Sequence, residues 1–107
     1  MAERRIPYEE RRPWTVPETL TELTGPTSGV VELPKHLDWS EMGRYNLDDP
    51  AELGLMYERV IRESMRVDDL RRFLNGAMLR RVWDRIFLPR TVRRLWEARF
   101  PDLHPTA

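Results

Sequence analysis

The sequence of 107 residues contains no cysteine and only two histidines. Without cysteine, neither a disulfide framework nor a cysteine-based zinc site is available. His36 and His104 stand alone in proline-flanked segments, so neither has the further His or Cys ligands that a metal site requires. We therefore expect a protein that binds no metal ion and no other cofactor.

Long apolar runs are also missing. The longest uninterrupted runs of apolar residues extend over only a few positions, which excludes membrane-spanning helices. The N-terminal sequence MAERRIPYEERRP alternates acidic with basic residues and has no apolar core segment, so neither a signal peptide nor a membrane span is expected there. These absences favour a cytoplasmic protein with no membrane partner.

The common catalytic motifs are absent as well. The segment 25–29, GPTSG, lacks the lysine and the following helix of a phosphate-binding loop. There is no Gly-x-Ser-x-Gly elbow. The acidic pairs Asp48-Asp49 and Asp68-Asp69 each precede an expected helix, where capping explains them better than acid–base catalysis or metal binding. We therefore expect a protein that is not an enzyme.

Charge is balanced overall but divided unevenly along the chain. Eighteen acidic residues face eighteen basic ones, so no net charge attracts the whole protein to a nucleic acid or an anionic membrane. Residues 1–50 carry ten acids and six bases, whereas residues 51–107 carry eight acids and twelve arginines. Only Lys35 among the bases is not arginine, a bias that GC-rich bacterial coding produces. The sequence thus predicts an acidic N-terminal part and a basic C-terminal part.

The first 47 residues have the composition of an arm. They contain five of the nine prolines, and a chain of this length supports only one small core. Pro17 and the Gly25-Pro26 pair would start and stop one short helix. Residues 30–33, VVEL, favour a short edge strand that Pro34 ends. We expect residues 1–47 to form a partly extended arm that wraps part of a helical domain at residues 48–107.

Helical signals begin at residue 48. Asp49 as cap, Pro50 and Glu52 form a strong helix start. The helix that follows carries an apolar stripe at helical spacing, formed by Leu53, Met56, Tyr57, Val60, Ile61 and Met65. The sequence therefore predicts a long amphipathic helix that buries one face.

Three shorter helices follow in the prediction. Asp68-Asp69 would cap the second, and Asn75-Gly76 would stop it or turn it sharply. The third would run from about residue 78 to Leu88-Pro89, and the fourth from Pro89 to about Phe100. The expected fold is mostly α, a small bundle of about four short helices with an extended Pro-rich N-terminal arm. Its core is predicted at Met56, Tyr57, Val60, Ile61, Leu70, Phe73, Leu74, Leu79, Val82, Trp83, Ile86, Leu95 and Trp96.

The segment 88–101, LPRTVRRLWEARFP, interleaves arginines with apolar residues. On a helix its apolar residues face the core while Arg90, Arg93 and Arg94 point away. A solvated face with an Arg93–Glu97 pair is the simplest interpretation. The alternative is a small DNA-binding transcriptional regulator that uses these three residues with Arg80 and Arg81, although the face lacks the Asn, Gln or Ser that read bases.

Aromatic residues in the arm raise a second question. Trp39 and Tyr45 could fold back and enlarge the small core. Alternatively, the arm aromatics could anchor another protein, because aromatics and arginine dominate interface hot spots. The partner-binding candidates are therefore Tyr8, Trp14, Trp39, Tyr45, Arg90, Arg93 and Arg94, with a homo-oligomer as a further possibility.

Five segments between residues 30 and 103 carry a family resemblance: LPKHLDWS, YNLDDP, LMYERVIRES, DDLRRFLNG and FLPRTVRRLWEARFP. They resemble small actinobacterial-type proteins found beside nucleotidyltransferase toxins of the AbiE class. The resemblance implies an antitoxin-like protein that binds and restrains a nucleotidyltransferase acting on RNA, with transfer RNA as the expected substrate. This chain lacks the Gly-Ser and paired-acid pattern of such a toxin. Its acidic arm could then cover a basic RNA groove on that partner.

Overall fold

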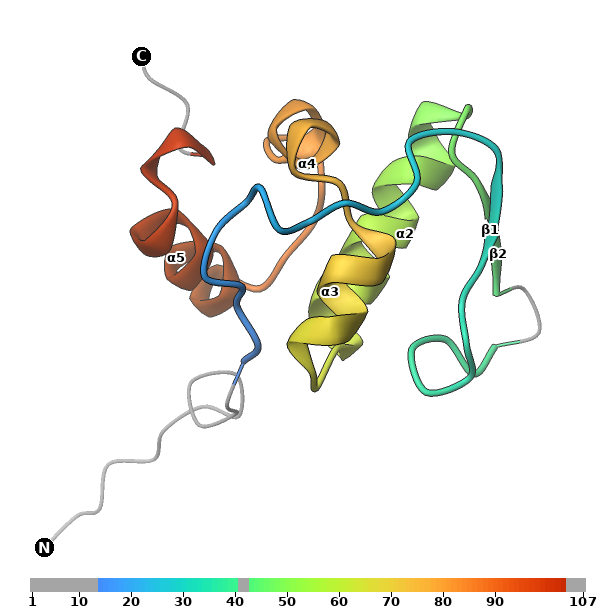
Figure 1. The fold of residues 1–107 in the computed structure, drawn as a ribbon, viewed down its shortest axis with the longest axis horizontal. Helices are drawn as coiled ribbons and strands as arrows, with labels where there is room; N and C mark the ends of the chain where they lie inside the picture. The colour runs from blue at the N-terminus through green and yellow to red at the C-terminus, as the bar shows by residue number, and fades with distance from the viewer. Residues whose placement is uncertain (1–13, 41–42, 104–107) are drawn as a thin grey trace, which may run out of the picture.

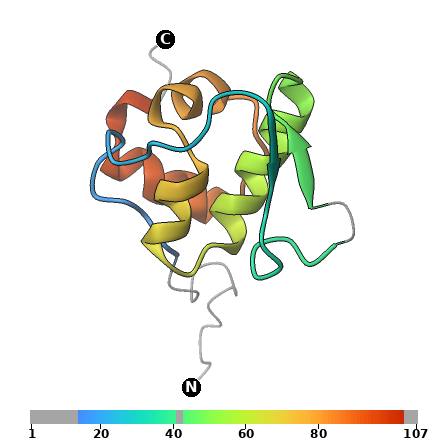
Figure 2. The same cartoon turned by 45° about the vertical axis from the view of Figure 1, so that its right-hand side comes forward.

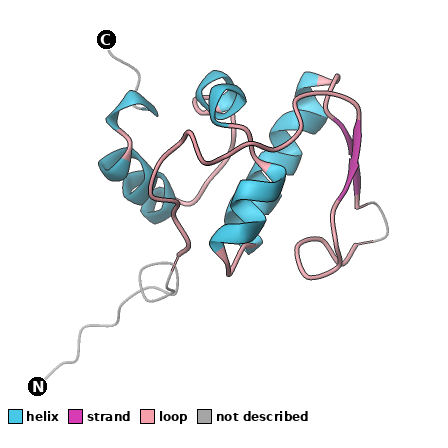
Figure 3. Ribbon diagram, in the orientation of Figure 1, coloured by secondary structure: helices cyan, strands magenta, loops and turns pink. Residues whose placement is uncertain are grey.

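The computed structural model describes residues 14–40 and 43–103. Within them the fold is mostly α, with four helices and one small antiparallel sheet, which confirms the predicted fold class (Figures 1 and 3). The elements are β1 (Val30–Glu32), β2 (Arg44–Asn46), α2 (Pro50–Glu63), α3 (Val67–Phe73), α4 (Gly76–Val82), α5 (Arg90–Arg99) and the 3-10 turn η1 (Pro101–Leu103).

Helix α2 begins where the sequence predicts. The Asp49 side chain accepts a hydrogen bond from the backbone N–H of Ala51 at 2.9 Å, and Pro50 opens the helix. Glu52 does not close a capping box with Asp49, because its Oε1 accepts from the backbone N–H of Asn46 at 3.0 Å instead. This contact fastens the end of β2 to the first turn of α2.

The end of α2 corrects one predicted member of its apolar stripe. The helix stops at Glu63, and both the N–H and the Oγ of Ser64 donate to the carbonyl of Val60, at 3.0 and 2.5 Å. Met65 therefore lies beyond the helix and does not continue its apolar stripe. Its side chain is 70% exposed, so the prediction that Met65 belongs to the buried stripe is wrong.

Helix α3 begins two or three residues earlier than predicted. Arg66 precedes its first turn, so Asp68 and Asp69 lie inside the helix and neither caps it. Asp69 is buried and both of its oxygens lie 3.1 Å from Nε2 of His36, while Asp68 contacts Arg71 at 3.4 Å. The first acidic pair caps a helix as predicted, and the second does not.

Asn75-Gly76 starts a helix as well as ending one. Asn75 Oδ1 accepts from the N–H of Met78 at 3.1 Å and so caps α4, of which Gly76 is the first residue. Helix α4 ends at Val82, and turns occupy residues 83–86, where the sequence predicts continued helix. Ile86 is nevertheless buried, because these turns still bring it onto the core.

Helix α5 packs through a narrow stripe. Val92 and Trp96 are fully buried, and Phe100 follows them into the core just before η1. Leu95 is 41% exposed, so its predicted place in the core is wrong. Helix α5 lies at one end of the molecule (Figure 1), and Val92 and Trp96 are its two buried residues.

The N-terminal segment has no helix at residues 17–23, contrary to the prediction. It crosses from the α5 side of the molecule, past α3 and α4, to the β1–β2 hairpin (Figures 1 and 2). On the way it exchanges backbone hydrogen bonds with the α3–α4 turn, from the N–H of Gly25 to the carbonyl of Leu74 at 2.7 Å and from the N–H of Gly76 to the carbonyl of Leu23 at 3.0 Å. These bonds replace those that a helix would have made.

The small sheet was predicted only in part. β1 forms where the sequence predicts an edge strand, and it pairs antiparallel with β2, with Val31 opposite Tyr45. Gly29 has a φ of +80° at the start of the hairpin, a conformation that favours glycine. Val31 and Tyr45 pack against the core, so the hairpin covers part of α2.

One core joins both parts of the chain. All predicted core residues except Leu95 are buried. The N-terminal part adds five leucines that the prediction did not include: Leu20, Leu23, Leu33, Leu37 and Leu47. Across the described ranges, no helix combines the length and the apolar character that crossing a membrane requires.

Candidate partner-binding surface

The residues predicted to bind a partner lie in separate places. Tyr8 falls outside the described residues. Trp14 is half-buried against the core, and Trp39 is 80% exposed in the connection between β1 and β2. Arg90 and Arg94 are exposed on α5. Since α5 and the hairpin lie on opposite sides of the fold, these residues do not form one surface (Figure 1).

Arg93 is engaged inside the fold. Its guanidinium lies 4.8 Å from the ring centre of Trp83, donates to the carbonyl of Ile86 at 2.6 Å, and lies 3.8 Å from Glu97. The predicted Arg93–Glu97 pair is thus present. Glu97 also accepts the indole N–H of Trp83 at 2.9 Å. Arg93 therefore joins α5 to the turns after α4, and little of its guanidinium is available to a partner.

A buried carboxylate organises the connection around Trp39. The side chain of Asp38 is inaccessible to solvent. It accepts hydrogen bonds from the backbone N–H of Ser40 at 3.0 Å, from the Ser40 hydroxyl at 2.6 Å and from the Tyr45 hydroxyl. Nε of Arg59 lies 4.0 Å away. These contacts join the chain on both sides of Trp39 to β2 and α2.

The ionisation of this network follows from its contacts. Burial opposes the charge on Asp38, yet the hydrogen bonds from Ser40 and Tyr45, together with the charge of Arg59, outweigh it and hold the pKa of Asp38 below its ordinary value. Burial and the neighbouring carboxylate raise the pKa of the Tyr45 hydroxyl. At neutral pH the network therefore consists of a carboxylate with two hydroxyl donors and one cation.

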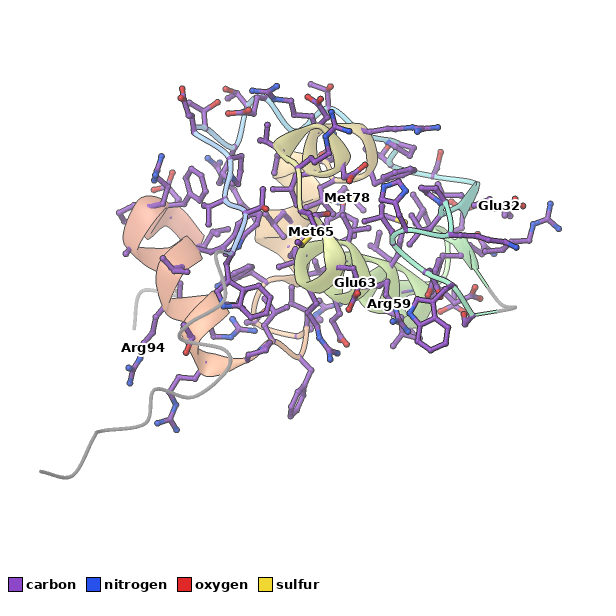
Figure 4. The ribbon with its side chains drawn as sticks, turned by 90° about the horizontal axis from the view of Figure 1, so that it is seen from below. Glu32, Arg59, Glu63, Met65, Met78 and Arg94 are labelled. Carbon is purple, nitrogen blue, oxygen red and sulfur yellow. The ribbon has the colours of Figure 1, made fainter. Side chains whose placement is uncertain are left out.

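Beside this network lies a groove of about 540 Å³ between the hairpin and α2. One wall of the groove comes from the hairpin side and the other from α2. The lining residues are Ser40, Arg44 and Tyr45 on the hairpin side, and Glu52, Leu55, Glu58, Arg59 and Arg62 on α2. Figure 4 shows Arg59 on this side of α2, far from Arg94. The hydrogen bond from the Asn46 N–H to Glu52 and the contact of Arg59 with Asp38 join the two walls, so the groove is preformed.

One exposed hydrophobic side chain lines the groove, and two others belong to residues that are joined to its lining. Leu55 lines it and is 54% exposed, and Trp39 precedes the lining residue Ser40. Phe87 is 83% exposed, and its backbone N–H donates to Oε2 of the lining residue Glu58 at 3.0 Å. We call the groove lining together with Trp39 and Phe87 the α2 face. It gathers three of the six large hydrophobic side chains that are exposed in the described part of the chain.

The α2 face has the composition of a binding surface. Aromatic and aliphatic side chains beside arginines are the composition of interface hot spots. In residues 14–40 and 43–103, no three His, Cys, Asp or Glu side chains gather in a way that could hold a metal ion. The imidazole of His36 contacts Asp69 and does not line the groove. The face offers shape, apolar area and charge, without an arranged nucleophile and base.

Sequence reasoning found part of this surface. Trp39 and Tyr45 were predicted as partner-binding residues, and both belong to the α2 face. Leu55 was missed, although it is the one leucine of α2 outside the apolar stripe, and that signal could have marked it. Phe87 was missed because only the contact of its backbone with Glu58 brings it to α2.

Comparisons of the chain with protein-family models, with curated proteins and with solved structures found no match.

Proposed function

We propose that this chain is an antitoxin-like protein that binds and restrains a nucleotidyltransferase toxin, with the α2 face as its binding surface. The class of the partner rests on the resemblance to small proteins that accompany AbiE-class toxins. The binding role is supported by one observation above all: Leu55 is exposed in the groove, and Trp39 and Phe87 are exposed on residues joined to its lining. A cytoplasmic protein that is not an enzyme fits this role.

The exposure of these side chains supports a protein partner. Isolated exposed hydrophobic residues are common on monomers, but a group beside a groove marks an interaction site. The backbone next to Trp39 is held through Asp38 and Ser40, so docking a partner there orders less of the chain. An exposed tryptophan is a residue type that is enriched in interface hot spots.

The alternative function is a DNA-binding regulator that uses five arginines. Two of these five contact other groups within the fold. Arg80 lies 3.3 Å from Asp102, and Arg93 is bound between Trp83 and the Ile86 carbonyl. Arg81, Arg90 and Arg94 remain exposed. A mobility-shift assay at low salt tests this alternative, because phosphate contacts are strongest there. Retention of DNA or RNA that weakens steeply with salt would favour it.

A nucleotidyltransferase encoded beside this gene is the partner that the proposal requires, and co-expression with it tests the proposed function. The wild-type chain should restore growth and co-purify with the enzyme. Trp39→Ala should weaken the complex at least about tenfold, as truncation of an interface hot spot does. Leu95→Ala is the matched control, since it truncates an exposed leucine on α5, outside the α2 face. Failure of the wild-type chain to bind or restrain that enzyme contradicts the proposal.

Point substitutions are preferable to deletion of the arm in this assay. Removal of residues 1–47 would also remove five core leucines, so the shortened chain would lose stability whether or not the arm touches a partner. The hypothesis that the acidic arm covers an RNA groove is better tested by replacing exposed carboxylates. Glu18→Gln changes such a charge on the described part of the arm.

A further inference from the structure

We infer that the α2 face receives an acidic segment of the partner protein that also carries an apolar anchor, with Arg62 as the residue that pairs with its carboxylate. This inference rests on the proposed function and specifies the chemistry of the partner at the same surface. It follows from which charged side chains of the groove already contact other groups of this protein and which do not.

Both glutamates that line the groove serve the fold. Glu52 accepts the backbone N–H of Asn46 at 3.0 Å and so attaches β2 to α2. Glu58 accepts the backbone N–H of Phe87 at 3.0 Å and so attaches the segment before α5. A carboxylate that already accepts a backbone N–H has less capacity to bind a partner's cation. The acidic side of the groove is therefore largely used by the protein itself.

The three arginines of the groove differ in their commitments. Nε of Arg44 lies 3.1 Å from Glu32, and Nε of Arg59 lies 4.0 Å from the buried Asp38. Arg62 has no ion-pair or hydrogen-bond partner among the residues that the structure describes. Its guanidinium retains five N–H donors in a planar fork, which matches a carboxylate in bidentate geometry. Arg62 is thus the available charge of the groove.

Apolar surface surrounds this charge. Leu55 lies two turns before Arg62 on the same side of α2, and Tyr45 forms the opposite wall. A partner side chain seated between Leu55 and Tyr45 would exclude water from the neighbouring carboxylate–guanidinium pair. Exclusion of water strengthens such a pair beyond an exposed ion pair. One acidic residue next to an aliphatic or aromatic residue meets both requirements.

A nucleic acid fits this face less well than a protein segment. A phosphate backbone would bring several negative charges near Glu52 and Glu58 and would leave Leu55 and Phe87 without apolar partners. A protein segment places one carboxylate at Arg62 and apolar atoms elsewhere. Charge complementarity therefore favours the protein segment.

The test measures affinity between the full chain and the nuclease-treated neighbouring nucleotidyltransferase by calorimetry. Arg62→Glu should weaken binding by about tenfold or more, since it removes one charge-assisted contact and adds repulsion. Arg62→Met keeps the apolar stem and should weaken binding less, with a shallower salt dependence than the wild type. Arg99→Glu is the control, because Arg99 is exposed on α5 and lies outside the α2 face. Equal melting temperatures confirm that the variants are folded.

The outcomes separate this inference from the proposed function. If Trp39→Ala weakens binding but Arg62→Glu leaves it unchanged or tightens it, the acidic segment is refuted while the protein-binding role stands. Loss of the wild-type interaction after nuclease treatment assigns the face to a nucleic acid and overturns the inference. If the untreated wild-type chain does not bind the enzyme, the proposed function itself fails.

Discussion

Gly76→Ala tests whether the N-terminal segment is built into the helical core. In most helices this substitution stabilises, by about 1 kcal/mol, because alanine is the better helix former. Here an added Cβ would lie 2.4 Å from the carbonyl oxygen of Leu20, where ordinary contact begins near 3.4 Å. The backbone of the N-terminal segment would have to move by about 1 Å, which strains the hydrogen bond from Gly76 to Leu23.

The expected balance is destabilising. The strain costs about 3 kcal/mol, the upper end for overpacking, and the better helix propensity of alanine offsets about 1 kcal/mol of it. The free energy of unfolding should therefore fall by about 2 kcal/mol. For a chain of this size that loss lowers the melting temperature by roughly 8 to 16 °C. Gly54→Ala is the matched control, since its added Cβ would meet only Ile86 Cγ2 at 3.7 Å and should raise stability slightly. If both variants melt above the wild type, the backbone of the N-terminal segment does not contact the start of α4.

Three further substitutions test the core and the Asp38 network by thermal or denaturant unfolding. Trp83→Ala should lower the free energy of unfolding by about 3 to 5 kcal/mol, because Trp83 is 1% exposed; an unchanged midpoint removes it from the core. Tyr57→Phe leaves the N–H of Asn75 without the acceptor it now has at 2.9 Å, so a loss of about 1 to 3 kcal/mol is expected, and a neutral result contradicts that contact. The lowered pKa of Asp38 means that its ionised form stabilises the fold above about pH 4 and that this stability is lost as the pH falls through the folded pKa. Asp38→Asn should therefore lose less stability than the wild type between pH 6 and pH 3, and parallel pH profiles contradict the network.

The predictable parts of the fold are those that local chemistry determines. Asp49 with Pro50 begins α2, and Pro89 precedes α5, because caps and proline act within one turn of the chain. Helical spacing identified most of the core for the same reason. The expected end of the third helix was wrong because tertiary contacts set it: Arg93 binds the carbonyl of Ile86 and Glu58 binds the N–H of Phe87.

The parts that sequence reasoning missed depend on distant partners. β2 reads RYN, which has no alternating apolar pattern, and it is a strand because it pairs with β1 and is bound by Glu52 of α2. The N-terminal leucines entered the core because Gly25 and Gly76 allow close backbone approach, at which a Cβ would meet neighbouring backbone atoms at 2.6 and 2.4 Å. Such approach is not visible in a local pattern.

Part of the candidate surface could also be predicted from the sequence, and part of it could not. Trp39 and Tyr45 were predicted from an unexpected concentration of aromatics in a proline-rich segment, and one of them is exposed and the other half-buried. Their association with Leu55, Arg62 and Phe87 could not be predicted, because it requires the hairpin and the segment before α5 to flank the same side of α2.

Side-chain oxidation footprinting of the complex locates the surface that binds the partner. Hydroxyl radicals label exposed aromatic and aliphatic side chains, and the extent of labelling is compared with and without the proposed nucleotidyltransferase partner. If the partner binds the α2 face, Trp39, Leu55 and Phe87, which are 80%, 54% and 83% exposed, become protected in the complex, while Leu95 on α5 stays labelled. Protection of Leu95 with unchanged labelling of Trp39 and Phe87 would place the partner on the opposite side and contradict the claim.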